Sequence, residues 1–143
     1  MHGTVAMMRK AAVRAGGVLA LAALCACGAP AAREDGALRT GRAYAAALSA
    51  RDYPAACRLL APVSREQLVA DEQDPCGPAL RSLGLPAPGA ADGVEVYGRQ
   101  ALLRMKGDTL FLSLFDDGWR ITAAGCDRQG GDQPYDCLLK GSG

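Results

Sequence analysis

The segment Arg99-Gln-Ala-Leu-Leu-Arg-Met-Lys106, followed by Gly107-Asp108 and Thr109-Leu-Phe-Leu-Ser-Leu-Phe115, decides the fold of this chain. In the first half, Ala101, Leu103 and Met105 alternate with more polar residues, and a period of two is typical of a strand with one buried face. In the second half, the three leucines share one face and the two phenylalanines lie on the other. A glycine and an aspartate between two such runs indicate a two-residue hairpin turn. We therefore expect two antiparallel strands joined at Gly107-Asp108.

The same pattern continues on both sides of this hairpin. Asp116-Asp117-Gly118 is typical of a second turn, and the segment Trp119 to Gly125 after it places Trp119, Ile121 and Ala123 on one face. A polar, glycine-rich loop then leads to a final strand from Tyr135 to Lys140, and a short β-prone run from Val94 to Tyr97 precedes the hairpin. Consecutive strands joined by short turns predict an antiparallel meander.

Helical patterns fill the chain before the strands. Apolar residues near helical spacing predict a first helix over residues 37–50, and Asp52 is a suitable N-cap for a second helix from Tyr53 to Leu60. Ser64 and Gln67 have the spacing of a capping box and predict a third helix. Asp74-Pro75 opens a fourth helix, which ends at Gly84. Helices followed by a meander indicate an α+β fold, with the helices packed on one face of the sheet.

The N-terminal segment has the parts of an export signal. Three basic residues, Arg9, Lys10 and Arg14, precede an uncharged apolar run from Ala15 to Leu24. This run is about half of the roughly 20 residues that a membrane-spanning helix needs. We therefore expect a removable signal rather than a transmembrane anchor.

The end of this apolar run, Leu24-Cys25-Ala26-Cys27-Gly28, resembles the lipobox of bacterial lipoprotein precursors. The resemblance implies that Cys27 carries a diacylglycerol and becomes the first residue, because Cys27 follows the small Ala26 whereas Cys25 follows the bulky Leu24. It divides the chain into a signal peptide (1–26), a flexible tether (27–36) and one domain (37–143). The protein would then be anchored at the outer face of the cytoplasmic membrane. The alternative is signal cleavage near Ala29-Pro30-Ala31, which would release a secreted protein.

Composition excludes several classes of function for the mature chain. Three of the 16 basic residues precede Cys27, so 13 basic and 15 acidic residues remain, a formal charge of −2 without long charged runs. Such a surface gives no electrostatic basis for binding nucleic acid. The one histidine, His2, lies in the signal, so a histidine-based catalytic relay is excluded and the commonest zinc ligand is absent. We expect no metal, cofactor or identifiable catalytic residue.

The four remaining cysteines form an even set, as in disulfide-bonded exported proteins. Three pairings are open to Cys57, Cys76, Cys126 and Cys137. We favour Cys57–Cys76 and Cys126–Cys137, because each pair falls within one local unit. The alternative, a metal site, lacks a CxxC spacing.

Two stretches resemble NTF2-like (SnoaL-like) domains. The first is Tyr44 to Leu60, which combines an aromatic-containing helix, Asp52 and a second short helix. The second is Asp117-Gly118-Trp119-Arg120-Ile121, which is similar to the late Gly-x-Trp-x-Ile strand of these domains. The resemblance implies a curved sheet and helices that form a cone around an apolar cavity. Tyr44, Tyr97, Phe111 and Trp119 are candidates for the cavity wall, and ordinary core packing is the alternative.

These observations predict a non-enzymatic binding module for a small apolar ligand or an envelope protein. The alternatives are a SnoaL-like isomerase, cyclase or hydrolase that uses Asp or Tyr alone, and a structural or inhibitory envelope protein. An enzyme needs a carboxylate or tyrosine of perturbed pKa inside an open cavity. A partner-binding protein would instead have a filled core and an exposed apolar patch.

Overall fold

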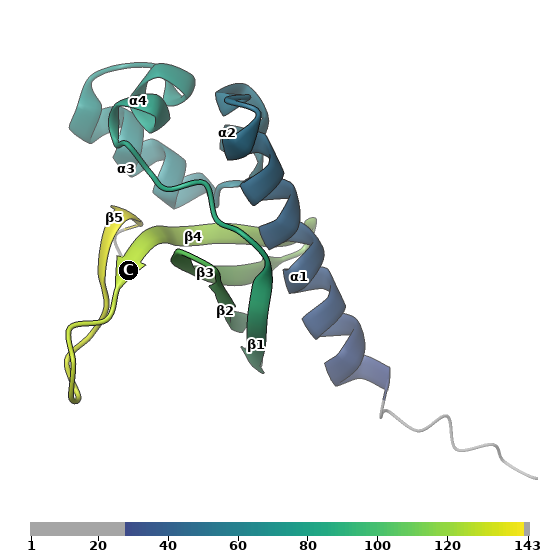
Figure 1. The fold of residues 1–143 in the computed structure, drawn as a ribbon. Helices are drawn as coiled ribbons and strands as arrows, with labels where there is room; N and C mark the ends of the chain where they lie inside the picture. The colour runs from purple at the N-terminus through teal and green to yellow at the C-terminus, as the bar shows by residue number, and fades with distance from the viewer. Residues whose placement is uncertain (1–27, 142–143) are drawn as a thin grey trace, which may run out of the picture.

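The computed structural model describes residues 28–141 as helices followed by one sheet (Figure 1). The helices of this part are α1 (Gly28–Ser49), α2 (Tyr53–Leu59), α3 (Pro62–Glu72) and α4 (Cys76–Ser82). The strands are β1 (Ala91–Tyr97), β2 (Gln100–Met105), β3 (Asp108–Phe115), β4 (Gly118–Asp127) and β5 (Asp136–Lys140). They form an antiparallel sheet in the order β1-β2-β3-β4-β5. The predicted α+β class and the meander are confirmed.

Helix α1 crosses one face of the sheet, called the inner face here, and packs against it through small residues. A β-carbon on Gly36 would lie 2.7 Å from Cδ1 of Trp119, and one on Gly41 would lie 2.1 Å from Cδ2 of Leu103. Both glycines are buried, as is Ala37 between them. Glycine is therefore needed at these two positions because the helix backbone lies directly on sheet side chains.

Residues 28–36 form the first turns of helix α1 and not the flexible tether that is expected for residues 27–36. Helix α1 begins at Gly28, so Gly28–Gly36 is helical, and Cys27 lies outside the described residues. Pro30 does not prevent this, because a proline in the first turn of a helix removes no intrahelical hydrogen bond. The alanines of this stretch favour helix, and the turns packed on the sheet remove the need for separate nucleation.

The short helices form a layer at the C-terminal end of α1 (Figure 1). Asp52 caps α2 as predicted, and its Oδ1 accepts a hydrogen bond of 3.1 Å from the backbone N–H of Ala55. A disulfide joins Cys57 of α2 to Cys76 of α4, with the two Cα atoms 6.2 Å apart, so the first predicted pairing is confirmed.

The predicted capping box at Ser64 and Gln67 is wrong. Helix α3 has Ala61 as its N-cap and makes no side-chain capping bond there. Ser64 is fully buried, and its Oγ donates a hydrogen bond of 2.8 Å to the carbonyl oxygen of Thr122 in β4. The serine therefore ties α3 to the sheet instead of starting the helix.

The predicted alternation holds in β2 and β3 but changes within β4. Trp119 and Ile121 are buried, yet the next buried residue is Ala124 and not Ala123. Neighbouring residues Phe111 and Leu112 pair with Ala123 and Ile121, so Thr122 is an extra residue in β4. Such a β-bulge reverses the facing of the residues beyond it.

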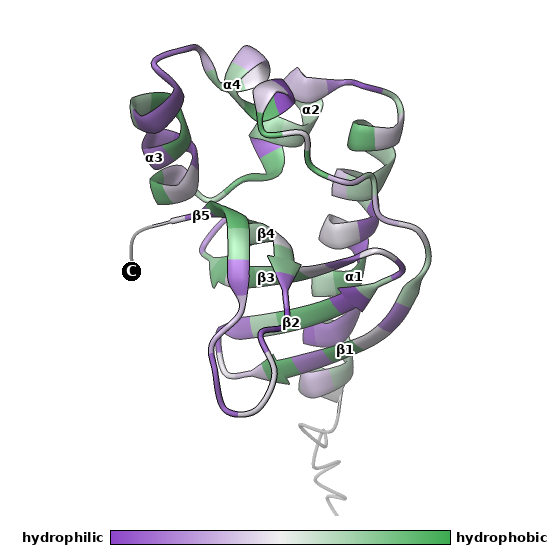
Figure 2. Cartoon of the chain, turned by 60° about the vertical axis from the view of Figure 1, so that its left-hand side comes forward, coloured by the Kyte–Doolittle hydropathy of each residue, from purple (hydrophilic) through white to green (hydrophobic). Residues whose placement is uncertain are grey.

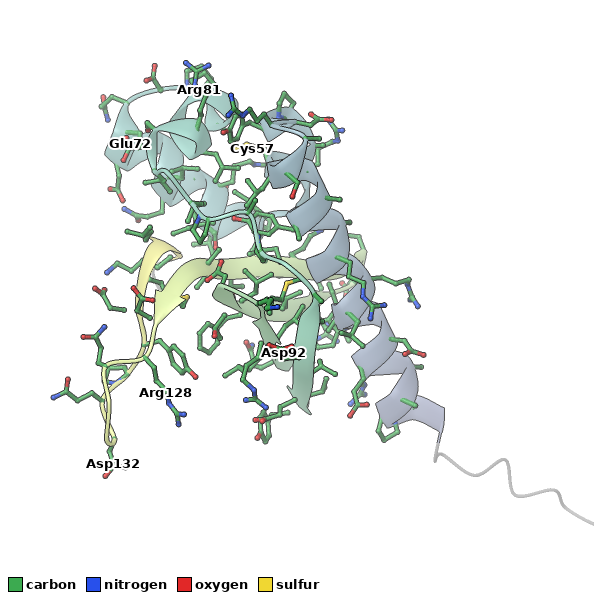
Figure 3. All side chains as sticks on the ribbon, in the orientation of Figure 1. Cys57, Glu72, Arg81, Asp92, Arg128 and Asp132 are labelled. Carbon is green, nitrogen blue, oxygen red and sulfur yellow. A yellow bond between two sulfur atoms is a disulfide. The ribbon has the colours of Figure 1, made fainter. Side chains whose placement is uncertain are left out.

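The second disulfide closes the hairpin of β4 and β5. Cys126 and Cys137 are directly paired residues of these strands, with Cα atoms 3.9 Å apart, and this pairing is also the predicted one. The loop between the strands projects away from the sheet and carries Arg128 and Asp132 (Figure 3).

Candidate functional site

The four predicted cavity residues do not share one site. Tyr44 on α1 is fully buried and Trp119 at the start of β4 is 7% exposed, and both belong to the core between α1 and the sheet. Tyr97, at the end of edge strand β1, is 68% exposed. Phe111 lies between two buried leucines of β3, so its side chain is on the opposite face, where its ring meets that of Tyr135 edge-on at 5.2 Å.

Side chains fill the space between α1 and the sheet where the sequence predicts a cavity. The residues that are fully buried there are large, and they come from the helix and the central strands: Tyr44, Leu103, Leu110, Leu112 and Ile121. Figure 2 shows hydrophobic residues along β2, β3 and β4, the strands that supply most of this core. Tyr44 and Trp119 therefore act as ordinary core residues, the alternative considered for them.

Two of the buried side chains that carry polar groups are Tyr44 and Asp108. The hydroxyl of Tyr44 is buried and has no hydrogen-bond partner among the described residues. Burial raises the pKa of Tyr44 well above its usual value, and the negative charge of Asp108 raises it further. Asp108 is itself only 8% exposed. An enzyme that used a buried tyrosine or carboxylate would have to use these two groups.

Asp108 is held by three backbone N–H groups. Its Oδ1 accepts from Thr109 at 2.7 Å and from Cys126 at 3.0 Å, and its Oδ2 accepts from Gly125 at 3.0 Å. Burial is the largest influence on the pKa of Asp108 and raises it, the three hydrogen bonds oppose this, and Asp127 raises it slightly. The carboxylate thus binds the backbone of β4 where Gly125 adopts a positive φ of 65°.

These contacts favour a structural role for Asp108 and Tyr44 over a catalytic one. A general base must reach the proton that it removes from a substrate, but both Asp108 oxygens already accept from the backbone, and Tyr44 is enclosed. The sequence predicts Asp108 in the hairpin turn, but the turn is Lys106-Gly107 and Asp108 pairs with Met105 in the sheet. The signal that could have located it is its period-two spacing with Leu110 and Leu112, which places it on the buried face.

A pocket that is open to solvent lies between α3 and the C-terminal end of β5. It has a volume of about 240 Å³ and is lined by Gln67, Asp71, Lys140 and Gly141. The side-chain amide of Gln67 donates to Asp71 Oδ1 at 2.7 Å. The pocket is smaller than the roughly 300–1,000 Å³ of typical ligand sites. Gln67 and Asp71 on one side are about 70 positions from Lys140 and Gly141 on the other, so no local motif could have predicted the pocket.

The two aspartates of the predicted turn at Asp116-Asp117-Gly118 lie on the surface. Asp117 forms an ion pair with Arg120 at 2.6 Å, and this hydrogen bond is the main reason that the pKa of Asp117 is lowered. Asp116 pairs with Arg99 at 3.5 Å and is fully exposed. Within residues 28–141, no three His, Cys, Asp or Glu side chains are grouped so that they could hold a metal ion.

The outer face of the sheet carries a partly exposed apolar row. Leu102 of β2 pairs with Phe111 of β3, and Phe111 in turn contacts Tyr135. All three are intermediate in burial and lie outside the core under α1. Beside the row, Glu95 accepts hydrogen bonds from Arg104 and Tyr97, which lower its pKa. This outer apolar row (Leu102, Phe111 and Tyr135) is partly open to solvent on the face of the sheet that α1 does not cover.

The fold and this surface define an α+β domain with a filled core and a partly open sheet face. Comparison with family models, curated proteins and solved structures finds no match to the chain. None of the helices formed by residues 28–141 has the length and apolar character that crossing a membrane requires. Cys27 and the predicted signal peptide lie outside these residues.

Proposed function

We propose that this chain is a lipoprotein attached by a diacylglycerol on Cys27 to the outer face of the bacterial cytoplasmic membrane. The observation that carries the proposal is the distribution of cysteines. Four of the six are paired within the domain, and such disulfides persist in oxidising compartments outside the cytoplasm. Of the other two, Cys27 alone has the small preceding residue that the lipobox resemblance requires.

The domain is proposed to be a non-enzymatic binding module. A protein partner in the cell envelope is favoured over a small apolar ligand, because the space under α1 is filled by core side chains. The outer apolar row supplies the contact surface for such a partner. A purely structural or inhibitory role would use the same surface.

Membership of the NTF2-like group is part of this proposal. It is supported by the order of helices before strands and by Asp117-Gly118-Trp119 at the turn into β4. In an NTF2-like cone, residues such as Tyr44 and Leu103 would occupy the interior. The SnoaL-like enzyme alternative would have to use Tyr44 and Asp108, and the three hydrogen bonds on Asp108 weigh against it.

The test of anchoring compares Cys27→Ala with Cys25→Ala, its matched control two residues away. Each full-length variant is expressed in a bacterium that processes lipoproteins, and membranes are separated from soluble fractions. We expect the wild type and Cys25→Ala to sediment with membranes and to show the mass of a lipidated Cys27. We expect Cys27→Ala to lack that mass. Unchanged mass and sedimentation of Cys27→Ala would refute the proposal, and a soluble wild type cut near Ala29 would indicate secretion.

A further inference from the structure

Helix α1 extends beyond the body of the domain at its N-terminal end (Figure 1). Residues 29–35 are all exposed, and Gly36 is the first buried residue of the helix. At Gly36 the backbone lies against the ring of Trp119. The eight residues 28–35 therefore continue the helix past its last contact with the sheet, over about 12 Å at 1.5 Å per residue.

Two properties make this extension stiff. It continues a helix that is already packed, so each added residue needs only propagation and not nucleation. The junction is also fixed, because Gly36 and Gly41 seat α1 directly on Trp119 and Leu103.

We propose that residues 28–35 form a rigid stalk that holds the domain at a set height and orientation above the lipid bilayer. This inference rests on the proposed lipid at Cys27, the residue immediately before the helix. The headgroup layer of one leaflet is about 5–8 Å thick. A stalk of about 12 Å crosses that layer and leaves the body a few ångströms above it.

The stalk also decides which surface faces the aqueous side. The 22 residues of α1 correspond to about 33 Å, so the layer of α2 and α4 is at the far end of the helix from Cys27. Figure 3 shows Cys57 and Arg81 at this distal end, opposite the start of α1. A partner that approaches from the aqueous side therefore meets α2 and α4 first, and the end of the body near Gly36 faces the lipid.

Trp119 makes the height measurable without an added label. It is the one tryptophan of the chain and lies where the stalk meets the body. The chain from Cys27 onward is coupled through its Cys27 thiol to a maleimide lipid in phosphatidylcholine vesicles that contain a dansyl-headgroup lipid. Energy transfer from Trp119 to dansyl then reports the height of the junction.

Three variants test rigidity. Four alanines inserted after Ala32 lengthen a helical stalk by about 6 Å and should lower energy transfer, whereas deletion of residues 29–32 should raise it. Replacement of residues 29–35 by an equal number of Gly and Ser should also raise it, because a free body reaches the lipid surface. Equal transfer in all four proteins, or a Gly/Ser variant that matches the wild type, would overturn the stalk.

The controls separate this inference from the proposed function. Residues 29–35 are exposed, so near-UV circular dichroism and urea midpoints of the variants should match those of the wild type. Chemical coupling attaches the lipid whether or not a cell does so. A failed stalk therefore appears as a change in the energy-transfer result, whereas failed lipidation appears only in the mass of the N-terminal peptide from cells.

Discussion

Gly41 of α1 lies so close to Leu103 of β2 that a β-carbon on the glycine would be 2.1 Å from the leucine Cδ2. Leu103 is fully buried, and Leu110 lies beside the same position at 3.6 Å. Neither leucine can move without displacing the rest of the core. This contact fixes the distance between the helix and the sheet, on which both the filled core and the stalk depend.

Gly41→Ala should therefore destabilise the domain. Alanine favours helix, but the clash with Leu103 forces repacking, for which overpacked cores lose about 1–3 kcal/mol. Urea unfolding followed by circular dichroism measures the change. The matched control is Gly77→Ala in α4, where the nearest atoms to the new methyl group are 3.9 Å away, an ordinary contact. The control should gain about 0.4–1 kcal/mol, and an equal loss in both variants would contradict the role of the Gly41 contact.

Tyr44→Phe should leave the domain as stable as before or more stable. The hydroxyl of Tyr44 is buried without a partner among the described residues, and a buried unsatisfied group costs about 1–3 kcal/mol. Removing it relieves that penalty and keeps the ring in the core. The comparison is Tyr53→Phe, which changes a half-buried tyrosine on α2. A loss of more than about 1 kcal/mol in Tyr44→Phe would mean that the hydroxyl donates a hydrogen bond, and Asp108, whose charge acts on Tyr44, would be the candidate acceptor.

Asp108 should make the domain less stable as the pH rises above about 4. Its pKa is raised in the folded state, mainly by burial, so the folded protein holds a proton that the unfolded chain has released. The stabilisation from this group is complete below the unfolded pKa and is lost as the pH rises through the folded pKa. The free energy of unfolding of the wild type minus that of Asp108→Asn, measured in urea across this range, should decrease with pH.

This subtraction removes the other titrating groups. Glu95 and Asp117 have lowered pKa values and produce the opposite slope, but they are present in both proteins. If Asp108→Asn does not fold, the carboxyl of Asp108 can be titrated by NMR in the wild type. A difference that grows with pH, or a carboxyl pKa below that of a free aspartate, would show that the three backbone hydrogen bonds outweigh burial.

The sequence predicted the class of the fold because its signals were local. Alternation in β2 and β3, the cap at Asp52 and the short separations of the cysteine pairs each involve neighbours along the chain. The start of α1 was missed because Ala, Pro and Gly without an apolar period look like a tether, whereas the packed turns after Gly36 extend the helix backward. Composition alone does not show that the following turns of the helix are packed on the sheet.

The errors at the site come from contacts that are distant in sequence. The bulge at Thr122 reverses the facing of Ala123 and Ala124, and Ser64 bonds to that same residue across 58 positions. The aromatic residues were grouped by type, but β1 ends with Tyr97 at an exposed edge and Phe111 faces away from α1. To predict which residues line one cavity, one must know which face of the sheet each side chain is on in several strands. That depends on the register between the strands.

The two disulfides should contribute unequally to stability. Cys57–Cys76 closes a separation of 19 residues and Cys126–Cys137 one of 11. In the loop-entropy model each contributes on the order of 3 kcal/mol, with about 0.5 kcal/mol more for the longer loop. The double variants Cys57→Ala/Cys76→Ala and Cys126→Ala/Cys137→Ala, compared by urea unfolding, should show this order. Losing the first bond leaves α4 held to α2 by side-chain packing alone, whereas β4 and β5 keep their backbone pairing after losing the second. A larger loss from the second pair would mean that the β4–β5 hairpin depends on its disulfide to stay on the sheet.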